Sequence, residues 1–477
     1  MLEPSTRVAR LLRVHAVAQP RINPAIVRSY DLRGCVGRQL GLSDAYALGL
    51  AYAAVAHRQG RARIAVCRDG RLTSPDLEEA LIAGLVAGGM QVQRLGLGPT
   101  PELYFVVFAA QLDGGIMVTG SHNPADQNGF KLVLGGEPVF GSSLQDLVAQ
   151  APVQRAGGSV CDLLMNGKSG SQSYIERLAQ LGATAPPLRV IWDCGSGAVG
   201  AVIGGLTQRL PGKHTLLNAV VDGRFPAHHP DPSVAENLRE LQAAVLAERA
   251  DLGIAFDGDG DRIGVVDSTG TIVWPDQLLL LLALEVLDSR RGAAIVADVK
   301  SSRVLFDEVA RHGGRAVMAP SGYVRVRDAM LREQAPLAGE MSGHIFFSDC
   351  WHSTDDALFV AMRLLLALGR RRHSLAEFRT SLPPTEATPE LRLPCPEHRK
   401  AQVISEVAAR LSCSDGVHID TTDGLRVTTE DGWWLLRASG TEPKLTVRCE
   451  AATGAGLERL RRTLMMQLAR SGVQCRG

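Results

Sequence analysis

Apolar, strand-like stretches alternate with helix-forming stretches in this chain, and the alternation restarts several times along its 477 residues. RARIAVC (61–67) has the aliphatic content of a strand, SPDLEEALIAGLVAGG (74–89) that of a helix, and QVQRLGLG (91–98) that of the next strand. The order returns at LRVIWDCGSGAVG (188–200) and GAAIVADVKSS (292–302). This rhythm is typical of layered α/β domains with mostly parallel or mixed sheets.

The length of the chain indicates that these strands and helices form several domains. One hydrophobic core stops growing at roughly 250–300 residues, so the chain favours about three or four domains. Two stretches rich in Gly/Ser or Pro, 156–173 and 381–398, predict connections. The predicted pieces are an N-terminal extension (1–24) and four domains, at 25–165, 166–275, 276–385 and 386–477.

Composition excludes several classes of protein. The 51 basic and 50 acidic residues give a net charge of +1, whereas a nucleic-acid-binding protein has a basic excess. Nine cysteines without a CxxC pair argue against a zinc or redox motif and for a reducing cytosol. The longest apolar run, Leu278–Leu284, is far shorter than the ~20 residues that span a bilayer. We therefore expect a cytoplasmic protein without membrane or nucleic-acid partners.

An acidic glycine loop is the strongest chemical signal. In IAFDGDGDRIGVVD (254–267) an apolar strand ends at Phe256, and Asp257, Asp259 and Asp261 follow at alternate positions. Two oxygens on one Mg²⁺ lie at most ~4.2 Å apart, so the backbone must curl, which the intervening glycines permit. A solvated acidic turn is the alternative. A calcium-binding EF-hand is excluded because Arg262 and Ser268 stand where it requires Gly and Glu.

A serine follows another apolar strand in GGIMVTGSHNPADQNGFK (114–131). Gly, Ser, Asn and Pro all favour turns, so Ser121 could belong to an ordinary loop. The alternative is that the end of the strand positions the Ser121 hydroxyl for chemistry.

Two further segments carry polar residues suited to a phosphorylated sugar. LLRASGTEPKLTVRCE (435–450) offers a guanidinium, hydroxyls and an open backbone to a phosphate, through Arg437, Ser439, Gly440 and Thr441. LAGEMSGHIFF (337–347) offers Glu340, Ser342 and His344 at alternate positions. Taken alone, the first segment could be a hairpin turn, and Glu340 could be a buried carboxylate satisfied by backbone amides.

One motif points elsewhere. GSGAVG (195–200) satisfies the dinucleotide pattern GxGxxG, and Asp222 follows at roughly the expected distance. A single match is weak, and it explains neither Ser121 nor the acidic loop, so NAD binding is not favoured.

Together these segments resemble the α-D-phosphohexomutase family, specifically its phosphomannomutase/phosphoglucomutase branch. The resemblance covers nearly the whole chain after about residue 24. The similar stretches, in family order, are VRSYDLRG (27–34), VCRDGRLTSP (66–75), LGPTPELYF (97–105), TGSHNP (119–124) with NGFK (128–131), DGRFPAHHPDPSVAENL (222–238), DGDGDR (257–262), ADVKSS (297–302), GEMSGH (339–344) and RASGTEPK (437–444).

The resemblance implies an architecture and an activity. The expected fold has three similar α/β domains and a smaller C-terminal α+β domain around a central cleft. The expected reaction interconverts hexose 1-phosphates and hexose 6-phosphates through a phosphoserine and a hexose 1,6-bisphosphate. Ser121 would carry the phosphoryl group, and Ser121, Asp257, Asp259 and Asp261 would bind Mg²⁺.

The resemblance also assigns the remaining candidate residues. The catalytic candidates beside Ser121 are Arg33, Lys131, Arg262 and Lys300, and the substrate-binding candidates are Tyr30, His122, Glu340, Ser342, His344, Arg437, Ser439, Gly440 and Thr441. The general base stays open, although arginine is a poor base and Lys131 or Lys300 is easier to deprotonate. Related mutases often carry Gly-His-Ser where this chain has Gly322-Tyr323-Val324, so a histidine role is not transferred. Tyr323 and Arg325 are uncertain replacements.

Substrate and assembly are the least determined features. Met341 in GEMSGH resembles the mannose/glucose mutases, where phosphoglucosamine mutases usually have Gln. The first expectation is mannose or glucose phosphate, and the second is glucosamine phosphate. A Mg²⁺-dependent sugar-phosphate phosphatase and a non-enzymatic sensor are alternatives of other classes. A monomer or weak homodimer is expected.

Overall fold

The computed structural model describes residues 21–473 except 151–152, 163, 166, 350, 372, 413–415 and 441–442. The predicted N-terminal extension lies almost wholly outside this part of the chain. The chain forms two compact units, the first made of Met1–Pro275 with Ser342–Ala376, the second of Asp276–Met341 with Glu377–Gly477. Among the described helices, none is both long and apolar enough to cross a membrane.

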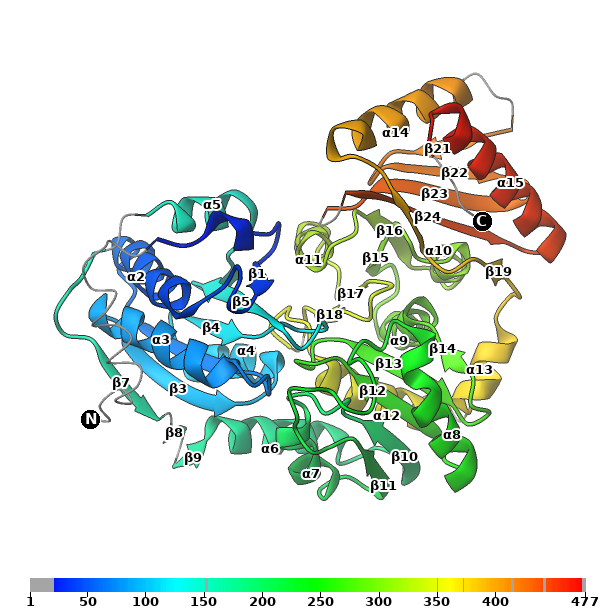
Figure 1. Ribbon diagram of the computed structural model, residues 1–477. Helices are drawn as coiled ribbons and strands as arrows, with labels where there is room; N and C mark the ends of the chain where they lie inside the picture. The colour runs from blue at the N-terminus through cyan, green and yellow to red at the C-terminus, as the bar shows by residue number, and fades with distance from the viewer. Residues whose placement is uncertain are drawn as a thin grey trace. The chain divides into compact units, whose positions relative to one another are not determined.

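The first sheet of unit 1 carries helices on both faces (Figure 1). Its strands, in spatial order, are β1 (Leu32–Cys35), β5 (Gln127–Leu134), β4 (Gly114–Val118), β2 (Arg63–Arg68), β3 (Gln91–Leu97) and β7 (Ser159–Asp162), and β6 (Glu137–Pro138) pairs with β5. Strand β5 runs antiparallel to its neighbours, whereas β2, β3 and β4 are parallel. The associated helices are η1 (Pro24–Ile26), α2 (Leu42–Arg58), α3 (Ser74–Ala87), α4 (Thr100–Ala109) and α5 (Gly141–Val148).

Strand β2 explains why this sheet is covered on both faces. Ile64 and Val66 pack in one core cluster with α2 and α3, whereas Ala65 and Cys67 pack in another with α4. Side chains of a strand alternate between faces, so an uninterrupted apolar strand requires a helix layer on each side.

The second sheet of unit 1 holds the acidic loop. Its strands are β11 (Gly212–Leu217), β10 (Leu188–Asp193), β12 (Leu252–Phe256), β13 (Ile263–Asp267) and β14 (Ile272–Val273). The first three run parallel, and β13 turns back antiparallel to β12. The other elements of unit 1 are β8 (Leu164–Met165), β9 (Lys168–Ser169), α6 (Gly170–Gly182), α7 (Gly200–Thr207), η2 (Ala235–Leu238), α8 (Arg239–Glu248), β18 (Ile345–Phe347) and α12 (Ala357–Arg371).

Unit 2 contains a parallel sheet and an antiparallel sheet. In the first, β15 (Ala294–Asp298) lies between β16 (Arg315–Ala319) and β17 (Leu337–Gly339). The second has the order β19 (Glu386–Ala387), β24 (Lys444–Ala451), β23 (Gly432–Ala438), β22 (Leu425–Thr429) and β21 (His418–Asp420), and β20 (Leu391–Pro394) also pairs with β24. The helices are α9 (Pro275–Ser289), α10 (Arg303–Arg311), α11 (Tyr323–Arg332), α13 (Leu375–Ser381), α14 (Glu397–Leu411) and α15 (Gly454–Arg470).

The two predicted connections are wrong in part. The stretch 156–173 contains β7, which pairs with β3, and the stretch 381–398 contains β20, which pairs with β24. Within the described residues, each of these strands has a partner on one side only. Pro394 pairs with Lys444 in β20. Proline lacks a backbone N–H, and it is tolerated in an edge strand because no further strand needs that donor.

Candidate active site

The Ser121 loop leaves the end of β4 in a strained conformation. Ser121 has φ +49°, in the left-handed region, which non-glycine residues seldom adopt, and its side chain is buried. The Ser121 N–H donates to Thr119 Oγ1 at 2.7 Å. Strain of this kind persists only where the surroundings enforce it, and it is frequent at functional sites.

Arg71 enforces that conformation, and the sequence analysis did not single it out. Its buried guanidinium donates to the carbonyl oxygens of Ser121 and Asn123, both at 2.6 Å, and to two further loop carbonyls. Asp69 Oδ2 accepts from Arg71 Nε at 3.1 Å and from Thr119 Oγ1 at 2.8 Å. The only signal for Arg71 in the sequence was its place in the VCRDGRLTSP stretch.

The acidic loop curls between β12 and β13. Asp257 Oδ1 accepts the N–H groups of Gly260, Asp261 and Arg262 at 3.0, 3.1 and 3.2 Å. Gly260 has φ +77°, which favours glycine. Gly258 is required for a different reason, because a Cβ there would lie 2.4 Å from the Ser121 carbonyl oxygen.

Ser121 and the acidic loop are thereby in contact. Ser121 Oγ donates to Asp257 Oδ2 at 3.0 Å, across 136 positions of the sequence. One oxygen from each of the three aspartates lies within 4.8 Å of the others. This is close to the ~4.2 Å limit for two oxygens on a single Mg²⁺.

The three buried carboxylates fit a divalent cation. Burial and the neighbouring Asp261 and Asp259 raise the pKa of Asp257 well above its ordinary value. Among the described residues, Asp259 Oδ1 and Asp261 Oδ1 are buried without a hydrogen-bond partner. Buried carboxylate oxygens without donors are suitable ligands for a hard cation, which would also remove their mutual repulsion.

Two basic side chains surround these carboxylates. Lys131 Nζ donates to Asp259 Oδ2 at 2.7 Å and also to Asp261. Burial opposes the charge of Lys131, but both carboxylates outweigh it and raise its pKa well above the ordinary value. Lys131 is therefore a cation in this arrangement. Arg33 donates to Asp31 at 2.6 Å and to Asn123 Oδ1 at 2.9 Å, so it also contacts the Ser121 loop.

Thr100 also holds the acidic loop, and the sequence analysis missed it. Its hydroxyl donates to Asp259 Oδ2 at 2.6 Å, and its N–H donates to the Asp259 carbonyl at 2.8 Å. A threonine at the start of α4 is ordinarily explained by helix capping, so the sequence alone did not indicate a contact with Asp259.

Arg262 and His344 form a second polar chain in unit 1. Arg262 Nε lies 3.0 Å from His344 Nε2, and His344 Nδ1 lies 2.7 Å from Asp355 Oδ2. Ser342 belongs to the same unit and is half-buried, as is Tyr30.

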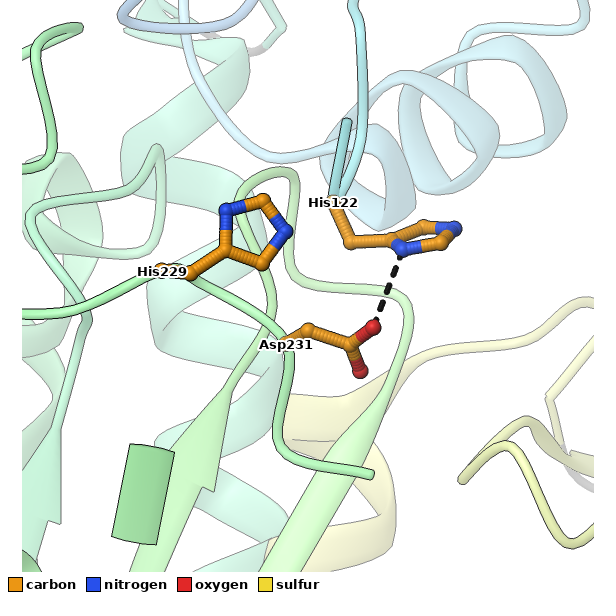
Figure 2. A group of neighbouring side chains, drawn as sticks. All are labelled: His122, His229 and Asp231. Atoms are coloured by element: carbon orange, nitrogen blue, oxygen red, sulfur yellow. Dashed lines mark hydrogen bonds and ion pairs between the residues drawn. The ribbon is translucent and has the colours of Figure 1, made fainter. Parts of the chain in front are cut away.

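His122 turns toward the HHPDP segment of the second sheet. Its Nδ1 lies 3.1 Å from Asp231 Oδ2 (Figure 2). Burial and the Arg262 charge lower the pKa of His122 to about 4, so its imidazole is neutral at neutral pH. Burial opposes ionisation of Asp231, but the bond from His122 and the charge of Arg262 outweigh it and lower the pKa of Asp231.

Unit 2 contributes candidate residues of its own. Lys300 Nζ lies 3.7 Å from Asp298 Oδ2 and 3.8 Å from Glu390 Oε2. Glu340 is buried and accepts the Gly322 N–H, in line with the structural alternative, a carboxylate bonded to a backbone amide. Tyr323 begins α11 directly after Gly322.

Asp423 brings several unit 2 groups together and was not identified from the sequence. Its Oδ2 accepts from Arg437 Nε at 2.9 Å and from the Ser321 N–H at 3.1 Å. Arg325 lies 3.8 Å from its Oδ1. Ser439 is buried and Gly440 is exposed on the turn between β23 and β24, whereas Thr441 lies outside the described residues.

The GSGAVG loop has a structural role. Ala198 N–H donates to the Gly258 carbonyl at 2.9 Å, and a Cβ at Gly197 would lie 2.8 Å from the same oxygen. The small residues therefore let this loop pack against the acidic loop.

Comparison with protein families matches four consecutive domains. They are domains I, II and III (α/β/α) and the C-terminal domain of phosphoglucomutase/phosphomannomutase, at residues 24–152, 172–270, 274–385 and 390–466.

Individual proteins are similar over almost their full length. A phosphoglucomutase of Neisseria gonorrhoeae is 42% identical over 91% of this chain and 95% of its own. A phosphomannomutase/phosphoglucomutase of Pseudomonas aeruginosa is 40% identical over 94% and 96%. The crystal structure of a phosphoglucomutase/phosphomannomutase family protein from Burkholderia thailandensis superposes with a TM-score of 0.88 at 38% identity, covering 95% of this chain and 99% of that one.

Proposed function

The chain belongs to the phosphoglucomutase/phosphomannomutase family, and from that premise we propose that it interconverts the 1-phosphates and 6-phosphates of mannose and glucose. The proposal draws on relatives named phosphoglucomutase and phosphomannomutase/phosphoglucomutase. The observation that carries it is the 3.0 Å contact between the Ser121 hydroxyl and the buried aspartate triad.

Ser121 carries the phosphoryl group in the resting enzyme. In the first half-reaction, the bond between Ser121 Oγ and phosphorus breaks while a hydroxyl of the bound hexose phosphate forms a new bond to phosphorus. The proton lost by that hydroxyl passes, through the side chains of the site, to the Ser121 Oγ that is released, and the product is a hexose 1,6-bisphosphate. In the second half-reaction Ser121 Oγ loses its proton and forms a bond to the other phosphorus, and the sugar oxygen released from that phosphorus gains a proton.

The surrounding side chains stabilise charge and hold the loop. Phosphoryl transfer depends mainly on positioning and on stabilisation of the transferring oxygens. Arg33 and Lys131 supply positive charge beside Ser121, and Arg262 does so from the acidic loop. A Mg²⁺ held by Asp257, Asp259, Asp261 and the oxygen on Ser121 would neutralise negative charge that develops on the phosphoryl group.

Lys131 acts in this scheme as a charge-stabilising group while it is paired with Asp259 and Asp261. Two carboxylates raise its pKa, so it holds its proton while it is paired with them. Lys300 is the other lysine candidate for proton transfer. The residues proposed to bind the hexose phosphate are Lys300, Glu340, Ser342, His344 and the 437–441 turn. Tyr323 and Arg325 are proposed as further contacts.

Intact-mass measurement tests the central proposal. Freshly purified protein should carry the mass of one phosphoryl group, and Ser121→Ala should lack it and lose mutase activity. Thr119→Ser is the matched control, because it keeps the hydroxyl that accepts the Ser121 N–H and should keep the phosphoryl group. An unphosphorylated wild type that turns over hexose phosphate without any bisphosphate would contradict the phosphoserine scheme.

Coupled assays on mannose, glucose and glucosamine 1-phosphate test the substrate. A strong preference for glucosamine 1-phosphate would overturn the proposed specificity. Dependence on a trace of hexose 1,6-bisphosphate separates a mutase from a phosphatase, which would release phosphate without it. The cytoplasmic location, the lack of membrane and nucleic-acid partners, the monomeric or weakly dimeric state and the domain boundaries stay predictions.

A further inference from the structure

A group of metal-ligating side chains lies beside the Ser121 loop and outside the aspartate triad. His122, His229 and Asp231 each offer one ligand atom, and these atoms lie within 4.8 Å of one another. His122 comes from the Ser121 loop of the first sheet, and the other two come from the HHPDP segment, residues 228–232, before η2 (Figure 2). The proposed mutase reaction assigns no role to His229 or Asp231.

From this geometry we propose that His122, His229 and Asp231 form a second metal site, distinct from the aspartate triad, that binds Zn²⁺ or a similar transition-metal ion. Two imidazole nitrogens and one carboxylate oxygen are a ligand set typical of Zn²⁺ and related metals, whereas Mg²⁺ prefers oxygen ligands alone. The fourth position would be open to water or to another oxygen.

The carboxylate is already oriented for this role. Asp231 Oδ1 accepts from Ser233 Oγ at 2.6 Å and from the Ser233 N–H at 3.1 Å, so Oδ2 is directed at His122. Partners outside the ligand shell that hold a ligating group raise the affinity of metal sites. Pro230 and Pro232 restrict the backbone on either side of Asp231, which limits the entropy lost on binding.

The two histidines suit a ligand role in different ways. His122 is half-buried, and its Nδ1 already lies 3.1 Å from Asp231 Oδ2, so a metal bound there would replace this hydrogen bond by ligation. His229 is exposed, and within the described part of the chain its imidazole has no hydrogen-bond partner. Ligand atoms on tetrahedral Zn²⁺ lie roughly 3.3–3.5 Å apart. Rotation of the exposed His229 side chain would bring its ring nitrogen to that spacing.

Arg262 opposes a cation here, since its charge acts on both His122 and Asp231. We therefore expect reversible binding. A metal in this site would hold His122 away from substrate and join the Ser121 loop to the HHPDP segment, so Zn²⁺ should inhibit phosphoryl transfer.

Zinc binding to the intact protein tests the site without reference to mutase activity. The full-length protein is dialysed against micromolar Zn²⁺ in millimolar Mg²⁺, which keeps the aspartate triad occupied, and bound zinc is counted. His229→Gln should weaken the most tightly bound zinc at least tenfold, whereas His229→Cys should retain it because a thiolate is also a zinc ligand. His418→Gln, which removes an exposed histidine of β21, should bind as the wild type does.

Equal zinc binding by wild type and His229→Gln would overturn the proposal, and so would zinc that is lost only from Asp259→Asn. Co²⁺ gives an independent signal, because nitrogen-coordinated tetrahedral Co²⁺ absorbs visible light far more strongly than Co²⁺ in an all-oxygen octahedral site. The strong absorption should appear in the wild type and be absent from His229→Gln. These binding results stand whether or not the protein proves to be a mutase.

Discussion

At the scale of single residues, Arg71 determines the conformation that places Ser121 against Asp257. One buried guanidinium satisfies the carbonyl oxygen of Ser121 itself and that of Asn123, both at 2.6 Å. These bonds hold Ser121 at φ +49°, a conformation that costs of order 1–3 kcal/mol without such support. In the proposed reaction, Arg71 would therefore act through the position of Ser121.

Arg71→Lys should lower kcat by roughly 10²-fold, because an ammonium cannot reach all four carbonyls and a displacement of ~1 Å at the reacting atom has an effect of that size. KM should change much less. Steady-state kinetics of purified variants measures both. Arg224→Lys is the control, since Arg224 is exposed and, among the described residues, pairs with Asp222, and it should match the wild type. An unchanged kcat in Arg71→Lys would show that the loop does not need this support.

At the scale of elements, the contact between the Ser121 loop and the β12–β13 turn depends on the absence of a side chain at position 258. Gly258→Ala would place a Cβ 2.4 Å from the Ser121 carbonyl, and one of the two loops must then move. We expect at least a tenfold loss of activity in coupled assays, with the circular dichroism spectrum retained.

Gly204→Ala is the matched control for that substitution. Gly204 lies inside α7, and a Cβ there meets no atom of the described residues within 4 Å apart from the backbone of its own helix. Because alanine favours a helix over glycine, this variant should gain about 0.5–1 kcal/mol of stability and keep full activity. Equal activity in both variants would mean that the two loops are not in tight contact.

Glu102 of α4, which lies against Ser171 of α6, should make the stability of the protein depend on pH. Burial raises the pKa of Glu102 to about 7 from an ordinary 4.5, although Ser171 Oγ donates to its Oε1 at 2.6 Å. The unfolded chain therefore releases this proton at lower pH than the folded chain. At ~1.4 kcal/mol per pH unit, the difference between 7 and 4.5 lowers stability by about 3–4 kcal/mol as pH rises through that window.

Glu102→Gln removes this dependence, because the amide stays neutral. Its melting temperature relative to that of the wild type should therefore rise between pH 5 and pH 8 and then level off. Glu79→Gln, which removes a half-buried carboxylate from helix α3, is the matched control. A melting-temperature difference that is independent of pH in Glu102→Gln would contradict a protonated Glu102 in the folded protein.

The elements also show what the sequence could predict. The strand–helix rhythm and the ordered motifs predicted the α/β fold, and family membership confirmed the resemblance. The edge strands β7 and β20 were missed because they lie in Gly- and Pro-rich stretches that favour turns, and only pairing with β3 and β24 makes them strands. Arg71, Thr100 and Asp423 were missed because their importance depends on contacts far along the chain, which no local pattern records.

At the scale of the whole molecule, the division into two compact units predicts where a cation acts. All three aspartates of the triad, and Ser121, belong to unit 1. A ligand that binds only the folded state lowers the population of open states, and it does so most in the segments that hold it. Mg²⁺ should therefore act unevenly along the chain.

Hydrogen exchange measured by mass spectrometry tests this directly. Adding Mg²⁺ should slow exchange in peptides that cover 119–124 and 257–262, because the cation replaces repulsion among buried carboxylates by ligation. Peptides from β22 and β23 of unit 2 should exchange at the same rate with and without the ion. Asp259→Asn should abolish the protection in unit 1, which separates site binding from a general effect of salt. Equal slowing in both units, or none at the acidic loop, would show that the triad is not where Mg²⁺ binds.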